Sequence, residues 1–131
     1  MTWRLCSARA AVVAAAMVAA APAVAADYIC VPLEVSVLDN RAHVECAAPA
    51  GKTRGGYPVD TGHAIVYFAV PLTDAAWAGR FIHVATLSMT SGMPMLIRYA
   101  SGDYSGETFG CARGNCRAPE AYGLQRTAHV P

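Results

Sequence analysis

Four cysteines follow residue 26 of this 131-residue chain, and they constrain its fold more than any other feature. They are Cys30, Cys46, Cys111 and Cys116. An even number of cysteines in a short exported chain is typical of a framework of two disulfides. Three pairings are possible, and we favour Cys111 with Cys116 and Cys30 with Cys46.

The segment "GCARGNC" at 110–116 could be a metal site, a redox centre or a structural bridge. Zinc needs a second cysteine pair or histidines at ligand spacing, and the histidines of this chain are scattered singly. They are His43, His63, His83 and His129. A thioredoxin-like centre has two residues between its cysteines, not four. The sequence therefore predicts a structural disulfide, no metal and no cofactor.

The first 26 residues have the layout of a secretory signal peptide. Arg4 and Arg9 precede an apolar run, and residues 23–25 (Ala-Val-Ala) form a small-residue cleavage pattern. The run is rich in alanine and is interrupted by proline, which makes it a poor bilayer anchor. We therefore expect a signal peptide over 1–26, no transmembrane anchor, and a single secreted or periplasmic domain over 27–131.

The charge balance excludes two classes of partner. The whole chain has ten basic and nine acidic residues, and loss of Arg4 and Arg9 leaves eight against nine. Binding to nucleic acid needs a basic surface, and binding to an anionic membrane needs a cluster of Lys and Arg. The sequence has neither feature, so we expect no nucleic-acid partner. About 105 residues suffice for one domain with one core.

Residues 30–46 are predicted to form a hairpin, because apolar and polar side chains alternate on both sides of the Asp-Asn pair at 39–40. A tight turn at that pair would place Leu33, rather than Cys30, opposite Cys46. Proline cannot donate to a strand ladder and is often found at strand starts and bulges. We therefore expect a bend at Pro32 that brings the two cysteines together.

The remaining sequence predicts one helix among further strands, and hence a mainly β fold of the α+β class. Residues 47–62 concentrate Gly, Pro and charge, which indicates an exposed loop. Residues 63–71 form an apolar run typical of a strand buried on both faces. A helix follows over 74–90, with Thr73 or Asp74 as its N-cap and Gly92 as its stop. Two further strands are expected, over 93–100 and 107–117.

The helix is apolar on two sides, whereas a surface helix needs one apolar stripe. One stripe holds Trp77, Phe81, Val84 and Leu87, and the other holds Ala78, Ile82, Ala85 and Met89. The helix could be wedged into the mouth of its own barrel. Alternatively, the second stripe is an oligomer interface that meets the same helix in neighbouring copies, with Arg80 and His83 lining the channel between them.

The order of these features is distinctive. A strand ("YFAVP") leads through one long helix to a second strand ("SGMPMLIRY"), and two cysteines with four residues between them follow ("GCARGNC"). Over residues 64–117 this order resembles the binding subunits of pertussis-like and subtilase-cytotoxin-type bacterial toxins. The resemblance implies a small OB-fold-like antiparallel barrel. It also implies a homo-oligomer, a pentameric ring, that recognises a host glycan or glycoprotein and delivers a catalytic toxin subunit.

Two loops carry the residue types that glycan binding requires, namely an aromatic face and polar groups for sugar hydroxyls. The first loop offers Tyr57, Lys52 and Arg54, and the second offers Ser101, Asp103, Tyr104 and Ser105. For each loop the alternative is a solvated turn. The family's own glycan contacts lie largely in its N-terminal half, where no matching serine is present, so no binding residue is transferred from it.

The sequence gives little support for catalysis. It has no Gly-x-Ser-x-Gly elbow. The hairpin places Glu34 near Glu45, and we interpret this pair as edge charges that discourage aggregation. We therefore expect a non-enzymatic binding subunit. The alternative function is a small secreted or periplasmic module or inhibitor that binds another protein as a monomer.

Overall fold

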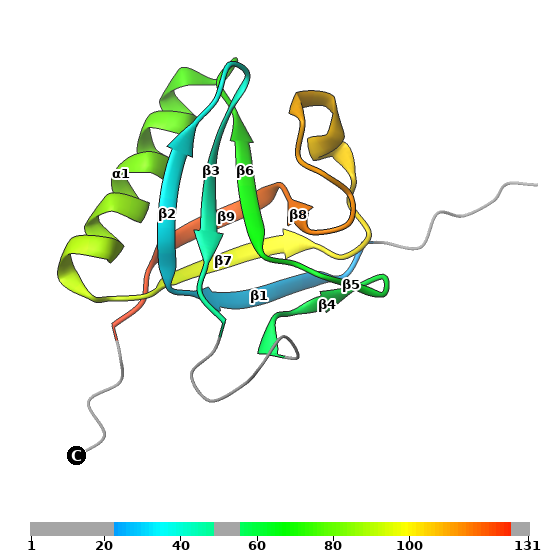
Figure 1. Cartoon of the computed structure of the whole chain (residues 1–131), viewed down its shortest axis with the longest axis horizontal. Coiled ribbons are helices and arrows are strands. Elements are labelled where there is room, and N and C mark those ends of the chain that lie inside the picture. The colour runs from blue at the N-terminus through cyan, green and yellow to red at the C-terminus, as the bar shows by residue number, and fades with distance from the viewer. Residues whose placement is uncertain (1–22, 49–55, 127–131) are drawn as a thin grey trace, which may run out of the picture.

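The structure is a computed structural model that describes residues 23–48 and 56–126. Figure 1 shows a single long helix lying beside a set of short strands. In chain order the elements are β1 (Ala25–Cys30), β2 (Pro32–Val37), β3 (Arg41–Cys46), β4 (Val59–Asp60), β5 (His63–Ala64), β6 (Tyr67–Pro71), α1 (Ala75–Ser91), β7 (Met95–Ala100), the 3₁₀ helix η2 (Ser105–Phe109), β8 (Cys116–Arg117) and β9 (Pro119–Leu124).

The strands form two main sheets and one small ribbon. One sheet has the order β1-β7-β9, the second has the order β2-β3-β6-β8, and β4 pairs with β5. Helix α1 contacts strands of both sheets (Figure 1). The expected mainly β fold with one helix is confirmed. The described residues form these small sheets without closing into a barrel, and the pairing of β6 with β8 is parallel.

The two cysteine pairs predicted from the sequence are confirmed. Cys30 at the end of β1 is bonded to Cys46 at the end of β3, with an S–S distance of 2.05 Å. Pro32 pairs with Cys46, and the register shifts between Pro32 and Glu34, which is the expected bend. Because Cys111 is bonded to Cys116, the segment at 110–116 is a structural bridge.

The first strand of the expected hairpin begins at Pro32 rather than at residue 30, and Cys30 instead ends β1, a separate strand that the sequence did not predict. β1 pairs with β7, whereas β2 pairs with β3, because the chain changes direction between Cys30 and Pro32. β2 is an edge strand, so its apolar face is only partly covered. Leu33 and Val37 remain 57% and 58% exposed.

Helix α1 begins and ends within one residue of the prediction. The Asp74 carboxylate accepts a hydrogen bond of 2.9 Å from the backbone N–H of Trp77, as an N-cap does. At the other end Gly92 adopts a left-handed conformation with φ of 73° and donates its N–H to the Ser88 carbonyl. Glycine is favoured at this position because it has no Cβ to oppose a positive φ.

The buried face of α1 combines the two predicted stripes. Its buried residues are Ala78, Phe81, Ala85 and Ser88. Ala78 and Ala85 are 2% and 0% exposed within the chain itself, so the expectation that they form an oligomer interface is wrong. Ile82 is half-buried against the core, and Met89 is 47% exposed. The helix therefore packs against its own sheets and leaves only part of the second stripe accessible.

The core lies between the helix and the two sheets. Its largest apolar side chains are fully buried: Phe68, Phe81, Ile65, Met95 and Ile97. The rings of Tyr28 and Tyr99 lie 6.1 and 5.5 Å from that of Phe68, measured between centroids. Full burial of a side chain of this size stabilises the fold by about 1.5–3 kcal/mol.

Three other expectations change in the structure. The strand expected over 107–117 is replaced by η2 and the two-residue strand β8. Residues 59–60 of the expected long loop form β4, which pairs with β5. Most of the expected signal peptide, residues 1–22, lies outside the described residues, while Ala25 and Ala26 begin β1. No helix in the described part of the chain is long and apolar enough to cross a membrane.

Candidate functional site

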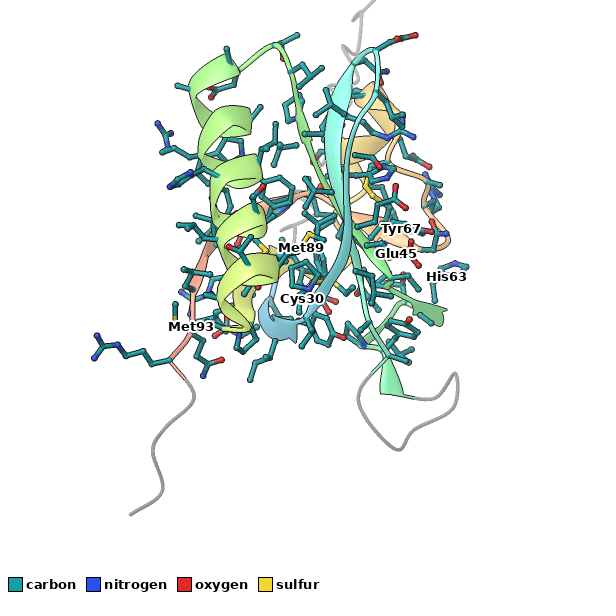
Figure 2. All side chains as sticks on the ribbon, turned by 60° about the vertical axis from the view of Figure 1, so that its left-hand side comes forward. Cys30, Glu45, His63, Tyr67, Met89 and Met93 are labelled. Carbon is teal, nitrogen blue, oxygen red and sulfur yellow. A yellow bond between two sulfur atoms is a disulfide. The ribbon has the colours of Figure 1, made fainter. Side chains whose placement is uncertain are left out.

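An open pocket of about 380 Å³ lies on the four-stranded sheet, on the face turned away from α1. We call it the sheet pocket. Its lining residues are Glu34, Arg41, His43, Glu45, Tyr67, Gly110, Ala112, Asn115 and Cys116. Figure 2 shows Glu45 and Tyr67 on the side of the strands opposite the helix. The pocket thus brings side chains from β2, β3 and β6 together with the loop closed by the second disulfide.

The alternation of β3 determines which residues reach this face. Ala42, Val44 and Cys46 are fully buried and point into the core, and the residues between them therefore point outward. Strand register then gives Glu45 two neighbours. It lies opposite Glu34 on β2 and opposite Tyr67 on β6. The centre of the pocket is therefore an aromatic side chain beside two carboxylates.

The disulfide loop forms the rim of the sheet pocket. The Asn115 carbonyl accepts hydrogen bonds of 2.9 Å from the backbone N–H groups of both Val66 and Tyr67. Cys116 pairs with Tyr67 in the parallel β6–β8 ladder. The loop is thus fixed to the sheet by backbone bonds as well as by the disulfide.

Gly110 at the start of this loop has a specific steric role. Its φ is 89°, a value that favours glycine. A Cβ at this position would collide with the guanidinium group of Arg41, another residue of the rim. The absence of a side chain at Gly110 therefore lets Arg41 lie along the edge of the pocket.

The carboxylates of the sheet pocket lack a basic partner among the described residues. Neither Glu34 nor Glu45 forms an ion pair there, and the hydroxyl of Ser36 donates a hydrogen bond to Glu34. Like charges directly opposite each other on paired strands destabilise a sheet. The pair therefore costs the fold some stability, and its oxygens are available as acceptors for a ligand.

The two rings of the sheet pocket favour their neutral forms. Burial lowers the pKa of His43. Arg41 also lowers it, whereas Glu34 and Glu45 raise it by a smaller amount. Burial and the nearby Glu45 raise the pKa of the Tyr67 phenol. The ring centroids of His43 and Tyr67 lie 5.4 Å apart, at an interplanar angle of 54°. Together they present an imidazole that can donate a hydrogen bond and a phenol that is hydrogen-bonded to Glu45, beside an apolar ring surface.

The loop predicted to bind through Ser101, Asp103 and Tyr104 uses these side chains internally. The Ser101 hydroxyl donates to Asp60 at 2.5 Å. Asp103 accepts hydrogen bonds from both the backbone N–H and the hydroxyl of Ser105, at 2.8 and 3.0 Å. These polar groups hold the loop in place.

Tyr104 is held on three sides. Its hydroxyl shares a hydrogen bond with Thr61 Oγ1. The guanidinium carbons of Arg113 and Arg117 lie 4.3 and 4.7 Å from its ring centroid, which is within cation–π distance. Tyr104 is therefore a packing residue between two segments of the chain, and its ring already contacts two guanidinium groups.

The other predicted loop is only partly described. Lys52 and Arg54 lie outside the described residues. Tyr57 is half-buried and lies just before β4, where it does not belong to the lining of the sheet pocket. The end of this loop contacts the other predicted loop through the Asp60–Ser101 and Thr61–Tyr104 hydrogen bonds, and none of the described candidate residues of either loop lines the sheet pocket.

A buried ion pair anchors the region behind the sheet pocket. The side chains of Arg117 and Asp60 are 0% and 1% exposed, and Arg117 Nε donates to Asp60 Oδ2 at 2.5 Å. Arg117 also donates to the carbonyls of Arg113 and Cys116, each at 2.7 Å. Gly102 N–H adds hydrogen bonds of 3.0 and 3.1 Å to the Asp60 carboxylate.

The charge state of Asp60 follows from this network. Burial raises the pKa of the carboxyl, but the hydrogen bonds from Ser101 and Gly102, together with Arg117, outweigh it and hold the pKa below its ordinary value. Asp60 is thus ionised at neutral pH and paired with the Arg117 guanidinium. The network joins β4, the loop after β7 and the disulfide loop.

Sequence reasoning named Glu34 and Glu45 but interpreted them as edge charges, and it missed His43, Tyr67 and Asn115. The period of β3 was sufficient to place Arg41, His43 and Glu45 on one face. The contribution of the loop at 110–116 had no local signal, because it depends on the parallel pairing of β6 and β8. In the described residues, no group of three or more His, Cys, Asp or Glu side chains could hold a metal ion.

No protein-family model matches the sequence, and no curated protein matches it.

Proposed function

We propose that this chain is a non-enzymatic module that binds a glycan in the sheet pocket. The observation that carries the proposal is the juxtaposition of Tyr67 with Glu34 and Glu45 on one open sheet face. A sugar ring presents apolar C–H faces and several hydroxyl donors. An aromatic ring beside carboxylate acceptors complements both features.

The remaining polar groups extend this complementarity. The amide of Asn115 and the guanidinium group of Arg41 lie on the rim, and His43 lies on β3, the strand that also carries Glu45. These side chains donate hydrogen bonds, whereas the carboxylates accept them. A ligand with hydroxyls of both roles, such as a sugar, can therefore be bound at several points.

The proposal is one of binding rather than catalysis. The pocket lies on a single face of a sheet and is open to solvent, so a bound sugar would be contacted mainly from one side. Catalytic sites gain much of their effect by excluding water and surrounding the reacting bond. The described residues provide no such enclosure.

The same proposal includes secretion and assembly, as the resemblance to toxin binding subunits implies. Two disulfides suit an oxidising compartment. Exposed apolar side chains on the edge strand β2 and on α1, namely Leu33, Val37 and Met89, offer a surface that neighbouring copies can cover. In this account the module is one subunit of a pentameric ring that binds a host glycan or glycoprotein and carries a catalytic toxin chain.

A second candidate function is a monomeric module or inhibitor that binds a protein. It is favoured by the free edge of β2, which can accept a strand from a partner through backbone hydrogen bonds. The two functions differ in ligand and in stoichiometry. Glycan affinity in a closed ring supports the first, and a monomer with one protein partner supports the second.

A glycan array probed with the purified chain tests the proposal. We expect a defined set of glycans to bind, and Tyr67→Ala and Glu45→Gln each to reduce binding at least tenfold. Glu120→Gln removes the same charge from an exposed position on β9, in the other sheet, and is the matched control. Absence of glycan binding, or equal binding by the Tyr67→Ala variant, would contradict the proposal.

A further inference from the structure

A second open groove, of about 470 Å³, lies between α1 and β9. We call it the helix groove. Its lining residues are Trp77, Gly79, Arg80, His83, Val84 and Tyr122. None of them belongs to the sheet pocket, and the proposed glycan site does not use them.

Two aromatic rings form the floor of the helix groove. The centroids of Trp77 and Tyr122 lie 4.5 Å apart at an interplanar angle of 55°. Tyr122 is fixed further by an edge contact with the buried Phe81, at 5.0 Å, and its hydroxyl donates to the Trp77 carbonyl at 2.7 Å. The rings are therefore held in place before any ligand arrives, which reduces the entropic cost of binding.

The polar groups of the helix groove are basic. The guanidinium carbon of Arg80 lies 5.8 Å from the Trp77 ring centroid, and His83 follows one turn later on the same exposed ridge. Arg80 forms no ion pair within the described residues. Asp74 acts on Tyr122, but its carboxylate already caps the helix.

Gly79 lies on the exposed side of the helix groove. A Cβ built at this position would have no heavy atom within 4 Å, so this side of the groove is open to solvent. A ring-sized group can therefore approach both the aromatic floor and the guanidinium group.

We propose that the helix groove binds a small aromatic carboxylate. The ligand ring would pack against Trp77 and Tyr122, in the tilted geometry that aromatic pairs prefer. Its carboxylate would accept charge-assisted hydrogen bonds from Arg80 and a further hydrogen bond from a ring N–H of His83. This site and the sheet pocket are independent, so either proposal can fail without the other.

The composition of the groove favours an aromatic ring over a sugar. A sugar needs several acceptors for its hydroxyls, and the groove offers no carboxylate or amide side chain. The Tyr122 hydroxyl is already engaged as a donor to the Trp77 carbonyl. What remains is an apolar aromatic surface with Val84 beside it and a positive charge at one end.

Tryptophan fluorescence measures this binding directly. The chain has two tryptophans, Trp3 and Trp77, and Trp3 lies in the expected signal peptide, so either removal of that peptide or a Trp3→Phe variant leaves Trp77 as the reporter. Titration with phenylacetate should change the Trp77 emission and saturate, with an affinity at least tenfold higher than that for 2-phenylethanol, which has the same ring without the charge. Equal affinity for the two compounds, or no change in emission with phenylacetate, would overturn the proposal.

Variants of the exposed residue Arg80 test whether its guanidinium group binds the carboxylate of the ligand. Arg80→Gln should reduce the affinity for phenylacetate at least tenfold, whereas Arg80→Lys, which keeps the charge, should retain most of it. Arg98→Gln makes the same charge change on β7, where Arg98 is paired with Asp27, and should leave the affinity unchanged. Loss of affinity in Arg98→Gln, or none in Arg80→Gln, would overturn the assignment.

Discussion

Asp60 and Arg117 are 57 residues apart in the sequence and form an ion pair that is almost completely removed from solvent. The pair ties the short strand β4 to the end of the disulfide loop, directly behind the rim of the sheet pocket. Such a pair stabilises a fold only when both partners are present and their remaining hydrogen bonds are satisfied. Ser101 and Gly102 complete the bonding of Asp60.

Removing one partner of this pair should destabilise the fold strongly. We expect Arg117→Ala to lower the free energy of unfolding by about 3–5 kcal/mol, because it leaves the Asp60 carboxylate buried without a counter-charge. The double variant Asp60→Leu/Arg117→Met should lose less than Arg117→Ala alone, since no charge is left buried. Urea denaturation measures both. A loss below about 1 kcal/mol for Arg117→Ala would contradict a dry, tightly coupled pair.

The same pair predicts a pH dependence with a definite sign. The pKa of Asp60 is lower in the folded chain than in the unfolded one, so the folded state binds this proton less readily. Its contribution is complete above the unfolded value, about 3.9, and is lost as the pH falls through the folded pKa. Stability should therefore decline in acid, and Asp60→Asn should flatten this part of the profile. An unchanged acid limb in Asp60→Asn would show that other groups cause it.

Phe81 and Leu87 provide a matched test of how α1 is oriented. Phe81 is fully buried, whereas Leu87 on the same predicted stripe is 39% exposed. Phe81→Ala should cost about 3–5 kcal/mol of stability, and Leu87→Ala should cost less than about 1 kcal/mol. Thermal or urea unfolding measures both. Equal losses would mean that the helix presents a different face to the sheets.

The two disulfides should differ in what their removal affects. In the chain-entropy model, replacing Cys30 and Cys46 by serine costs about 3 kcal/mol, and replacing Cys111 and Cys116 costs about 2 kcal/mol because the loop is shorter. Only the second replacement loosens the rim of the sheet pocket, so only it should reduce glycan affinity. Calorimetric titration of each double variant, at a temperature where both are folded, measures this difference. A reduction of similar size in both variants would argue against a specific role for the rim.

Assembly as a ring predicts a light-scattering mass that is a multiple of the chain mass. Met89→Glu should then give a folded monomer, because Met89 is 47% exposed and its replacement leaves the core intact. Arg80→Ala, on the polar ridge of the same helix, should keep the ring. Ile82 is a poorer test than Met89, because it also packs against the core of its own chain. A monodisperse monomer of the unmodified protein at tens of micromolar would exclude the ring.

Features with a local cause could be predicted from the sequence. Asp74 and Gly92 mark the ends of the helix because capping and left-handed geometry depend on neighbouring residues. The bend at Pro32 followed from the missing N–H of proline and the need to join two cysteines. The pairing of Cys111 with Cys116 involves a loop of six residues, which leaves little conformational choice.

Features that depend on long-range pairing could not be predicted. β1 lacks the alternation of β2 and begins within the expected signal peptide, so nothing local indicates that it pairs with β7 in a different sheet. Arg117 follows a cysteine in an ordinary turn sequence, and its partner Asp60 lies in a loop rich in glycine. Part of the sheet pocket could be predicted, because strand alternation places His43 and Glu45 on the same face of β3. The sequence did not show that α1 packs on the other face of the sheet and so leaves the face with His43 and Glu45 open.

The central claim is that a glycan binds in the sheet pocket, and amide chemical-shift mapping by NMR tests it most directly. A glycan selected on the array is titrated into the isotope-labelled chain. We predict that the largest shifts cluster at residues 41–45, at Tyr67 and at Asn115, on three elements that are far apart in sequence and adjacent in the sheet pocket. Shifts centred instead on Tyr104 or on α1, with the pocket residues unperturbed, would contradict the claim.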